Sequence, residues 1–148
     1  MVDAFANMPS RSLTIVGDGV LRAKLRRRAT PNITFMHNVN DNQLAELYST
    51  SKALIMPQRE DFGYTSLEAQ SCGCPVIAFG RGGATTTVIH GATGIFFDAQ
   101  SVSAIKKALD SYEENEYAMR RSLGEHAKKH LSQFSTKKFK SKFTTLLA

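Results

Sequence analysis

The sequence predicts an α/β domain with a doubly wound, Rossmann-like and mostly parallel sheet. Five short apolar runs lie near residues 13–16, 33–36, 53–56, 75–79 and 94–97, and a glycine, proline, aspartate or histidine follows each run. Apolar runs of this length are typical of strands buried in a parallel sheet. Helix-compatible segments separate them, as in an alternating βα fold. We expect one domain over residues 1–148, with an α/β core at about 1–110 and C-terminal helices at 111–148.

Composition narrows the class of protein. A hydrophobic content of 42% and a charged content of 22% are ordinary for a globular domain. The sequence has no apolar run long enough for a membrane span and no signal-peptide pattern at its start. Cys72 and Cys74 are too close in sequence for an unstrained disulfide, and two ligands do not make a zinc site. We therefore expect a reduced pair in a cytoplasmic protein.

Two helices are predicted in the first third of the chain. A basic helix is expected over Leu21–Ala29, with its arginines in solvent. Asp41 is expected to cap a second helix, from Asn42 to Ser49, whose buried face carries Leu44, Leu47 and Tyr48.

The segment 60–68 is the main candidate site. It follows the strand at 53–56 and leads into a helix that ends before Gly73, so it is a strand-to-helix loop of the kind that binds ligands in open parallel sheets. Gly63 permits close approach of the backbone, and the helix start offers unpaired N–H groups to an anion. The carboxylates of Glu60 and Glu68 are acceptor-only groups that suit sugar hydroxyls. Together they predict a sugar-nucleotide site.

A purely structural interpretation of the same residues stays open. Thr65 and Glu68 have the spacing of a capping box, in which Glu68 would only satisfy the first helical turn. Glu60 and Asp61 would then be a solvated loop pair.

A family resemblance favours the sugar-nucleotide interpretation. Glu60 and Glu68, with Phe62-Gly63 between them, resemble the E-x7-E signature of retaining GT-B glycosyltransferases of family 4. The match continues through Gly73-Cys74-Pro75-Val76-Ile77-Ala78, the pair Gly82-Gly83, and Gly91-x-x-Gly94. The segment from Glu60 to Gly83 is most similar to the mannosyltransferase-like branch. The resemblance covers about Val2 to Leu109 and implies a donor-binding C-terminal domain.

The resemblance also implies roles for individual residues. Glu60 is the expected catalytic residue, and it would hold hydroxyls of the donor sugar while Glu68 holds the ribose. The other expected donor-binding residues are Asp61, Phe62, Gly63, Tyr64, Thr65, Gly17, Gly19, His37, Asn38, Gly82 and Gly83. Two positions depart from the family, because His37 stands where glycine is common and Thr86 where glutamate is common. No cofactor and no metal are expected, only a nucleotide-sugar donor such as GDP-mannose.

The family pattern has further parts that this sequence does not contain. One strand near the centre of the sheet would precede residue 1, and its following loop carries the Arg and Lys that hold the diphosphate. An N-terminal acceptor-binding domain would precede that strand. We therefore expect exposed sheet edges that favour self-association, and no transfer activity from this chain alone.

The C-terminal third carries most of the positive charge. Residues 101–148 contain ten Lys/Arg and five Asp/Glu, whereas the whole chain has a net charge of +6. One interpretation of this positive charge is that it lies on solvated helix faces. The other is that it attracts the parent protein to an anionic membrane surface. Nucleic-acid binding is not expected. His126 and His130 have the spacing of two zinc ligands, but a solvated helix face is the better interpretation. A non-catalytic module that binds nucleotide sugars is the alternative function.

Overall fold

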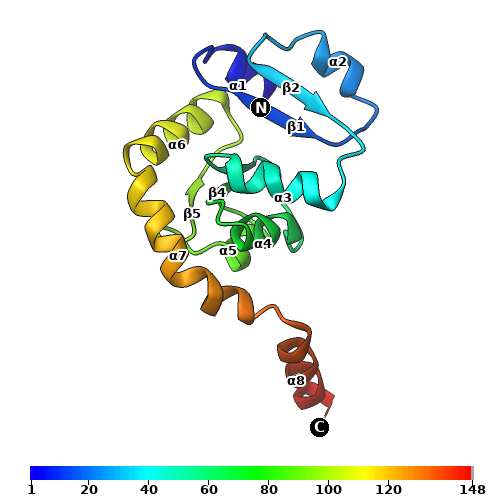
Figure 1. The fold of residues 1–148 in the computed structure, drawn as a ribbon, viewed down its shortest axis with the longest axis vertical. Coiled ribbons are helices and arrows are strands. Elements are labelled where there is room, and N and C mark those ends of the chain that lie inside the picture. The colour runs from blue at the N-terminus through cyan, green and yellow to red at the C-terminus, as the bar shows by residue number, and fades with distance from the viewer. Residues whose placement is uncertain (148) are drawn as a thin grey trace.

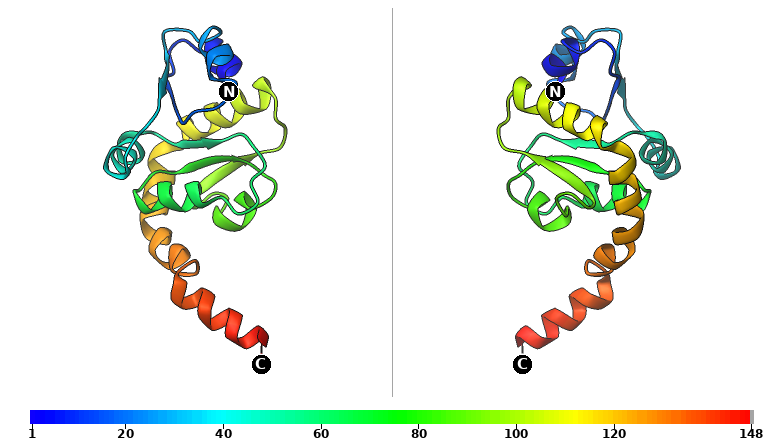
Figure 2. Two further views of the ribbon diagram at one scale, coloured as in Figure 1. Left: turned by 90° about the vertical axis from the view of Figure 1, so that its right-hand side faces the viewer. Right: turned by 90° about the vertical axis from the view of Figure 1, so that its left-hand side faces the viewer.

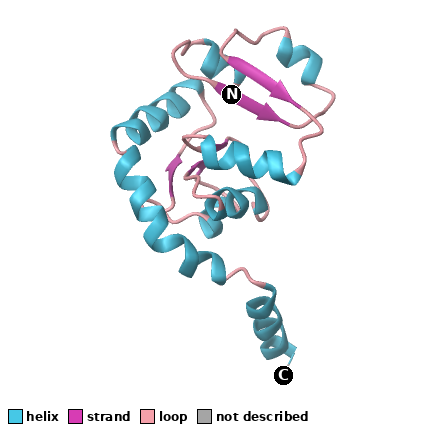
Figure 3. Cartoon of the chain, in the orientation of Figure 1, coloured by secondary structure: helices cyan, strands magenta, loops and turns pink. Residues whose placement is uncertain are grey.

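The computed structural model describes residues 1–147 and contains five strands in two all-parallel sheets. Strands β1 (Leu13–Val16) and β2 (Ile33–Met36) form one sheet. Strands β3 (Leu54–Met56), β4 (Val76–Phe79) and β5 (Gly94–Phe97) form the other, with β4 in the middle. Figures 1 and 3 show the pair β1–β2 lying apart from β4 and β5. The predicted strands and the α/β class are confirmed, but the strands form two sheets.

The three-stranded unit, residues 53–97, is densely packed. Val76, Ile77 and Ala78 of β4 are fully buried, because strands pair with both edges of β4 and helices cover its faces. Helix α4 (Tyr64–Ser71) follows β3, and the short helix α5 (Ala84–Thr87) follows β4. This arrangement explains why the sequence of β4 is uniformly apolar.

The two-stranded unit, residues 13–36, is more open. Along β1, half-buried and exposed residues alternate, and 42% of the Val16 side chain is exposed. Helix α2 (Arg22–Arg26) has no buried residue and is shorter than the predicted span 21–29. This unit is therefore covered on fewer sides than the three-stranded unit.

Helix α1 (Val2–Ala6) and helix α6 (Val102–Glu114) join the two units through a common core. Val2, Phe5 and Ile33 belong to the same buried cluster as Ile105 and Leu109. Apolar residues from both ends of the chain thus hold the two-stranded unit against the rest.

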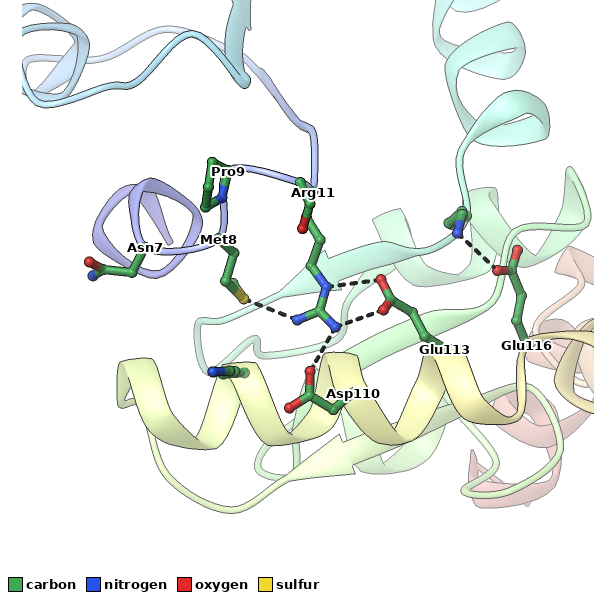
Figure 4. Close-up of a pocket in the computed structure, with 10 residues that line it drawn as sticks. Asn7, Met8, Pro9, Arg11, Asp110, Glu113 and Glu116 are labelled. Carbon is green, nitrogen blue, oxygen red and sulfur yellow. Dashed lines mark hydrogen bonds and ion pairs between the residues drawn. The ribbon is translucent and has the colours of Figure 1, made fainter.

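An ionic contact reinforces this joint. Arg11, which precedes β1, donates to Glu113 at 2.7 and 3.0 Å and to Asp110 at 2.6 Å, both on α6 (Figure 4). The two carboxylates raise the pKa of the arginine. These residues line a small cavity of about 530 Å³, and we interpret the cluster as a structural tie.

The remaining helices begin and end close to the predicted positions. Helix α3 spans Asp41–Thr50, but its cap is Asn40, which forms a reciprocal capping box with Gln43. The prediction that Asp41 is the cap was wrong by one residue. Ser101 caps α6, and Asn115 separates α6 from α7 (Glu116–Ser132). Helix α8 (Thr136–Leu147) extends away from the body, as Figure 2 shows from two sides.

Candidate functional site

The loop after β3 contacts the glycine turn after β4. Gly83 N donates to Glu60 O at 2.7 Å, and Glu60 forms a parallel bridge with Gly82. A side chain at either glycine would clash with backbone atoms, at Gly82 with the Glu60 carbonyl and at Gly83 with Phe62. The junction thus brings Glu60 beside Gly82 and Gly83, which were all expected to bind the donor.

Helix α4 begins directly after this junction. Its N-cap is Gly63, at φ 88°, a left-handed conformation that glycine adopts without strain. No side chain caps the helix. The capping box of Thr65 and Glu68 is therefore not formed, and that interpretation of Glu68 was wrong. The first turn of α4 keeps open N–H groups beside Glu60 and Gly63, a suitable environment for an anion.

The Glu68 carboxylate lies toward α3. Its Oε2 is 3.4 Å from the hydroxyl of Tyr48, which is buried. Burial, followed by the negative charge of Glu68, raises the pKa of Tyr48 to about 12. Tyr48 therefore stays protonated and can donate to Glu68, which orients the carboxylate.

A groove of about 910 Å³ separates the two sheets. Residues of β1 and β3 line it, together with Thr65 and Glu68 of α4 and Gln58 of the preceding loop. Both strands present unpaired edges here. Leu13 N donates to Asn32 O on the β2 side, and Leu54 N donates to Pro75 O on the β4 side. In a parallel strand, successive residues direct their backbone N–H and C=O groups to opposite edges. The backbone groups of Thr14 and Ile55 therefore point to the unpaired edges.

The remaining predicted residues occupy three places. Phe62 and Tyr64 are exposed at the corner, with ring centroids 4.7 Å apart, and Asp61 is exposed beside them. Gly82 and Gly83 form the junction described above. Gly17, Gly19, His37 and Asn38 lie in the exposed loops after β1 and β2, and they are absent from the lining of the groove. The structure thus brings the loop after β3 against the turn after β4. Glu68 lines the groove, whereas Glu60 is absent from its lining, and the predicted residues of the two-stranded unit lie elsewhere.

Arg22 organises the loops of the two-stranded unit. Its guanidinium lies 3.1 Å from Nδ1 of His37 and 3.6 Å from a carboxylate oxygen of Asp18. Asn38 adopts φ 53°, and Gly17 adopts φ 129°. These contacts connect the loop after β1 to the loop after β2.

Sequence reasoning missed three residues at the junction. Gln58 Nε2 donates to the Glu60 carboxylate at 2.5 Å, so this carboxylate turns toward its own loop. The hydroxyls of Ser66 and Thr87 lie 2.6 Å apart and are fully buried. Thr87 directly follows Thr86, the position at which the sequence departs from the family, and this departure was the available signal.

Neither a metal site nor a membrane-spanning helix is found within residues 1–147. No group of three or more His, Cys, Asp or Glu side chains in this range is arranged to hold a metal ion. None of the described helices is both long and apolar enough to cross a membrane.

Comparisons with known proteins agree with this geometry. A family model described as "Glycosyl transferases group 1" matches residues 1–130. The GDP-mannose-dependent monoacylated alpha-(1-6)-phosphatidylinositol monomannoside mannosyltransferase of Corynebacterium glutamicum is 33% identical over 120 residues, which cover 74% of this chain and 31% of the relative. The D-inositol 3-phosphate glycosyltransferase of Gordonia bronchialis is 33% identical over 111 residues, 70% of this chain and 22% of the relative.

A solved structure extends the comparison to the fold. Sucrose-phosphate synthase from Thermosynechococcus elongatus matches with a TM-score of 0.75 and 30% identity, over 88% of this chain and 36% of that protein. The chain thus spans about a third or less of these proteins. With the family model matching most of its length, the chain belongs to the group 1 glycosyltransferases and has the α/β fold of their GT-B class.

Proposed function

We propose that the chain is the donor-binding part of a retaining glycosyltransferase. The enzyme would transfer a hexose, mannose or a close relative, from a nucleotide sugar to a glycan or lipid-linked acceptor. The name of the Corynebacterium relative supports this, because it states dependence on GDP-mannose and transfer of mannose. The chain covers 31% of that relative, so the acceptor-binding domain would be a separate part of the parent protein.

One observation carries the proposal: along the chain, the open first turn of α4 lies between Glu60 of the preceding loop and Glu68, one turn into the helix. The backbone carbonyl of Glu60 holds this loop against Gly83 N, and Glu68 lines the groove. The turn begins at Gly63 without a side-chain cap. An anion at this turn would meet N–H groups and the positive end of the helix dipole. Hydroxyl groups on either side of that anion would meet carboxylate acceptors.

We assign roles in the reaction to these residues as part of the proposal. Charge develops on the nucleoside diphosphate as the glycosidic bond breaks, and the N–H groups at the start of α4 would stabilise it. Glu60 would hold hydroxyls of the donor sugar, and the backbone of Phe62 and Gly63 would contact the sugar. Glu68, oriented by Tyr48, would hold the ribose diol. Gly17, His37 and Asn38 would border the nucleotide, with the two-stranded unit closing on it from across the groove.

Calorimetry with GDP, UDP, GDP-mannose and UDP-glucose tests this proposal. We expect at least one nucleotide to bind to the wild-type chain and Glu68→Ala to weaken binding at least tenfold. Glu46→Ala, an exposed glutamate of α3, is the matched control and should bind as the wild type does. EDTA should not change the affinity. Equal affinity in the Glu68 and Glu46 variants would remove Glu68 from the site.

A binding module without catalytic activity is the second candidate, because the chain spans only part of its catalytic relatives. An assay of mannose transfer separates the two. We expect no transfer by residues 1–148 alone and transfer when the chain is joined to an acceptor-binding domain. Transfer by the chain alone would contradict the division of roles proposed here.

We also propose that the parent protein works in the cytoplasm, at an anionic membrane surface. Both cysteines are free, as suits a reducing compartment. Helix α8 exposes Phe139, Phe143 and Leu146, and it carries four lysines and no acidic residue. This pattern is typical of interfacial helices. Vesicles containing phosphatidylglycerol should sediment with the chain, and neutral vesicles should not; binding to both alike, or to neither, would contradict the proposal.

A further inference from the structure

The C-terminal end of α7 lies beside the corner formed by Glu60–Gly63. Nε2 of His130, in the last turn of α7, lies 2.9 Å from the carbonyl oxygen of Thr87. Phe134, just after the helix, packs edge-on against Phe62 with ring centroids 5.9 Å apart. The rings of His130 and Phe134 are themselves 5.2 Å apart. A segment about seventy residues downstream, by number, thus touches the candidate donor loop directly.

Thr87 connects this contact to the interior of the site. Its hydroxyl lies 2.6 Å from that of Ser66 and donates to Gly83 O at 3.2 Å. The Ser66 hydroxyl donates to Thr87 Oγ1, and Gly63 O, at 2.7 Å, is the alternative acceptor of its single proton. The side chain of Thr87 therefore joins the residue that begins α4 to the glycine turn after β4. Both hydroxyls are fully buried, so no water competes for these bonds.

The carbonyl of Thr87 faces the opposite way, toward α4 and α7. Gln70 Nε2 donates to it at 2.8 Å, and His130 is its second partner. A carbonyl oxygen only accepts, so Nε2 of His130 must carry a proton. The carbonyl is satisfied in part by α7, and loss of His130 would leave it with one partner.

Aromatic packing forms the outer part of this contact. Phe62 is 38% exposed, and its ring lies against Tyr64 on one side and Phe134 on the other. Gly83 leaves no room for a side chain beneath Phe62. Phe134 thus adds a contact from the segment after α7 to the partly exposed ring of Phe62. Phe134 also lies outside residues 1–130, the part that the family model matches.

We propose that His130 and Phe134 are positioning residues for the donor loop. By holding the end of α7 on Thr87 and Phe62, they fix the conformation of Glu60–Gly63 and the start of α4. They touch no reacting atom, and their effect on catalysis would pass through the geometry of Glu60 and the open N–H groups. The functional consequence rests on the proposed donor site, whereas the conformational restraint does not.

Hydrogen–deuterium exchange tests the restraint directly, with no ligand present. We expect His130→Ala and Phe134→Ala to accelerate exchange in the peptide covering residues 60–70 about tenfold. The peptide covering β1 and β2 should keep the wild-type rate. His130→Gln supplies a side-chain N–H donor and should restore slow exchange. His126→Ala is the matched control, because His126 is exposed one turn earlier on α7 and bonds only within that helix.

Wild-type exchange at 60–70 in both variants would overturn the proposal. Equal acceleration in all peptides would overturn it too, because His130 and Phe134 would then contribute only to global stability. Phe134→Leu, which keeps apolar volume, should give an intermediate rate if the aromatic contact is the restraint.

Calorimetry with GDP then separates this proposal from the proposed function. If the donor site and the positioning role are both correct, His130→Ala weakens GDP binding about fivefold. His130→Gln and His126→Ala then bind GDP as the wild type does. If the wild type binds no nucleotide, the donor site fails while the exchange data still decide the restraint. If His130→Ala accelerates exchange but binds GDP normally, the positioning role is refuted.

Discussion

The two units of this molecule are built from the same kind of sequence but are held together differently. Each has short apolar strands that run in parallel, and each has glycine-containing loops, after β1 in one unit and after β3 and β4 in the other. In the three-stranded unit, the loops are fixed by backbone contacts, such as Gly83 N to Glu60 O. In the two-stranded unit, side chains such as Arg22 and Asn32 hold the loops and connections.

The difference follows from the number of neighbours that each strand has. Strand β4 has paired edges on both sides, so the loops at its end approach one another closely. Strand β1 pairs only with β2, and its other edge faces the groove. A glycine is therefore required where backbones touch, and is dispensable where the loop is open. The following predictions test this contrast, from the largest expected effect to the smallest.

Gly83→Ala should destabilise the protein by about 3 kcal/mol, at the upper end of typical overpacking costs. The added methyl group would meet the carbonyl, carbonyl carbon and Cα of Phe62, and backbone atoms cannot rotate away. Urea denaturation followed by circular dichroism measures the change.

The control is Gly19→Ala in the two-stranded unit. Gly19 has no atom within 4 Å of the added methyl position, and we expect a change within about 0.5 kcal/mol. If the two variants were equally stable, the backbone contact at Gly83 would not restrict the loop, and the contrast between the units would fail.

Asn32→Leu should cost about 2 kcal/mol, because it leaves backbone carbonyls without a donor. Nδ2 of Asn32 lies 3.0 Å from Phe5 O, 3.1 Å from Met8 O and 2.7 Å from Arg11 O. The same denaturation experiment applies. Asn42→Leu, an exposed site on α3, is the control and should change stability little. A small effect at Asn32 would show that the apolar contacts of α1 suffice to hold the two-stranded unit.

The strands of both units were predicted from the sequence, but only in the three-stranded unit could the meeting of the loops be predicted as well, for a physical reason. Val76, Ile77 and Ala78 are all apolar because they are buried on all sides, and this pattern is readable without a structure. Adjacent parallel strands place their following loops side by side, so the contact of Glu60 with Gly83 was also predictable. The position of His37 relative to Glu60 depends on the groove, and no local pattern encodes it.

Contacts between distant segments were the other failure of prediction. His130 was interpreted as part of a solvated helix face, yet its ring is half-buried against Thr87. The periodicity of α7 shows which residues share a face, but not which element covers that face. The expected cap at Asp41 failed for a local reason, because Asn40 and Gln43 together form a capping box that Asp41 does not.

The exposed edge of β1 should cause self-association. At micromolar concentration, we expect light scattering to show species larger than a monomer, because unpaired strand edges recruit other chains. Val16→Lys should weaken this association about tenfold, since a lysine on an edge strand opposes pairing. Val20→Lys, in the fully exposed turn after β1, is the control and should associate as the wild type does. A monomeric wild type would contradict the prediction.

The burial of the three-stranded unit should also appear in the pH dependence of stability. Burial raises the pKa of the Cys74 thiol from 9.0 to about 11, and Arg120 opposes this shift. In the unfolded chain, the thiol loses its proton near pH 9, whereas the folded protein retains it. Between these values, the folded state binds more protons, so stability must fall as pH rises. The expected loss from this group is about 1 kcal/mol by pH 10, because one pKa unit corresponds to about 1.4 kcal/mol.

Comparison with Cys74→Ala isolates this contribution, because alanine does not titrate. Other groups, including Tyr48, whose pKa is raised to about 12, contribute to the alkaline decline of both proteins and cancel in the difference. The stability difference between wild type and Cys74→Ala should be constant up to about pH 8 and shrink above pH 9. A difference that stayed constant to pH 11 would mean that water reaches Cys74, and that the three-stranded unit is less tightly closed than its packing indicates.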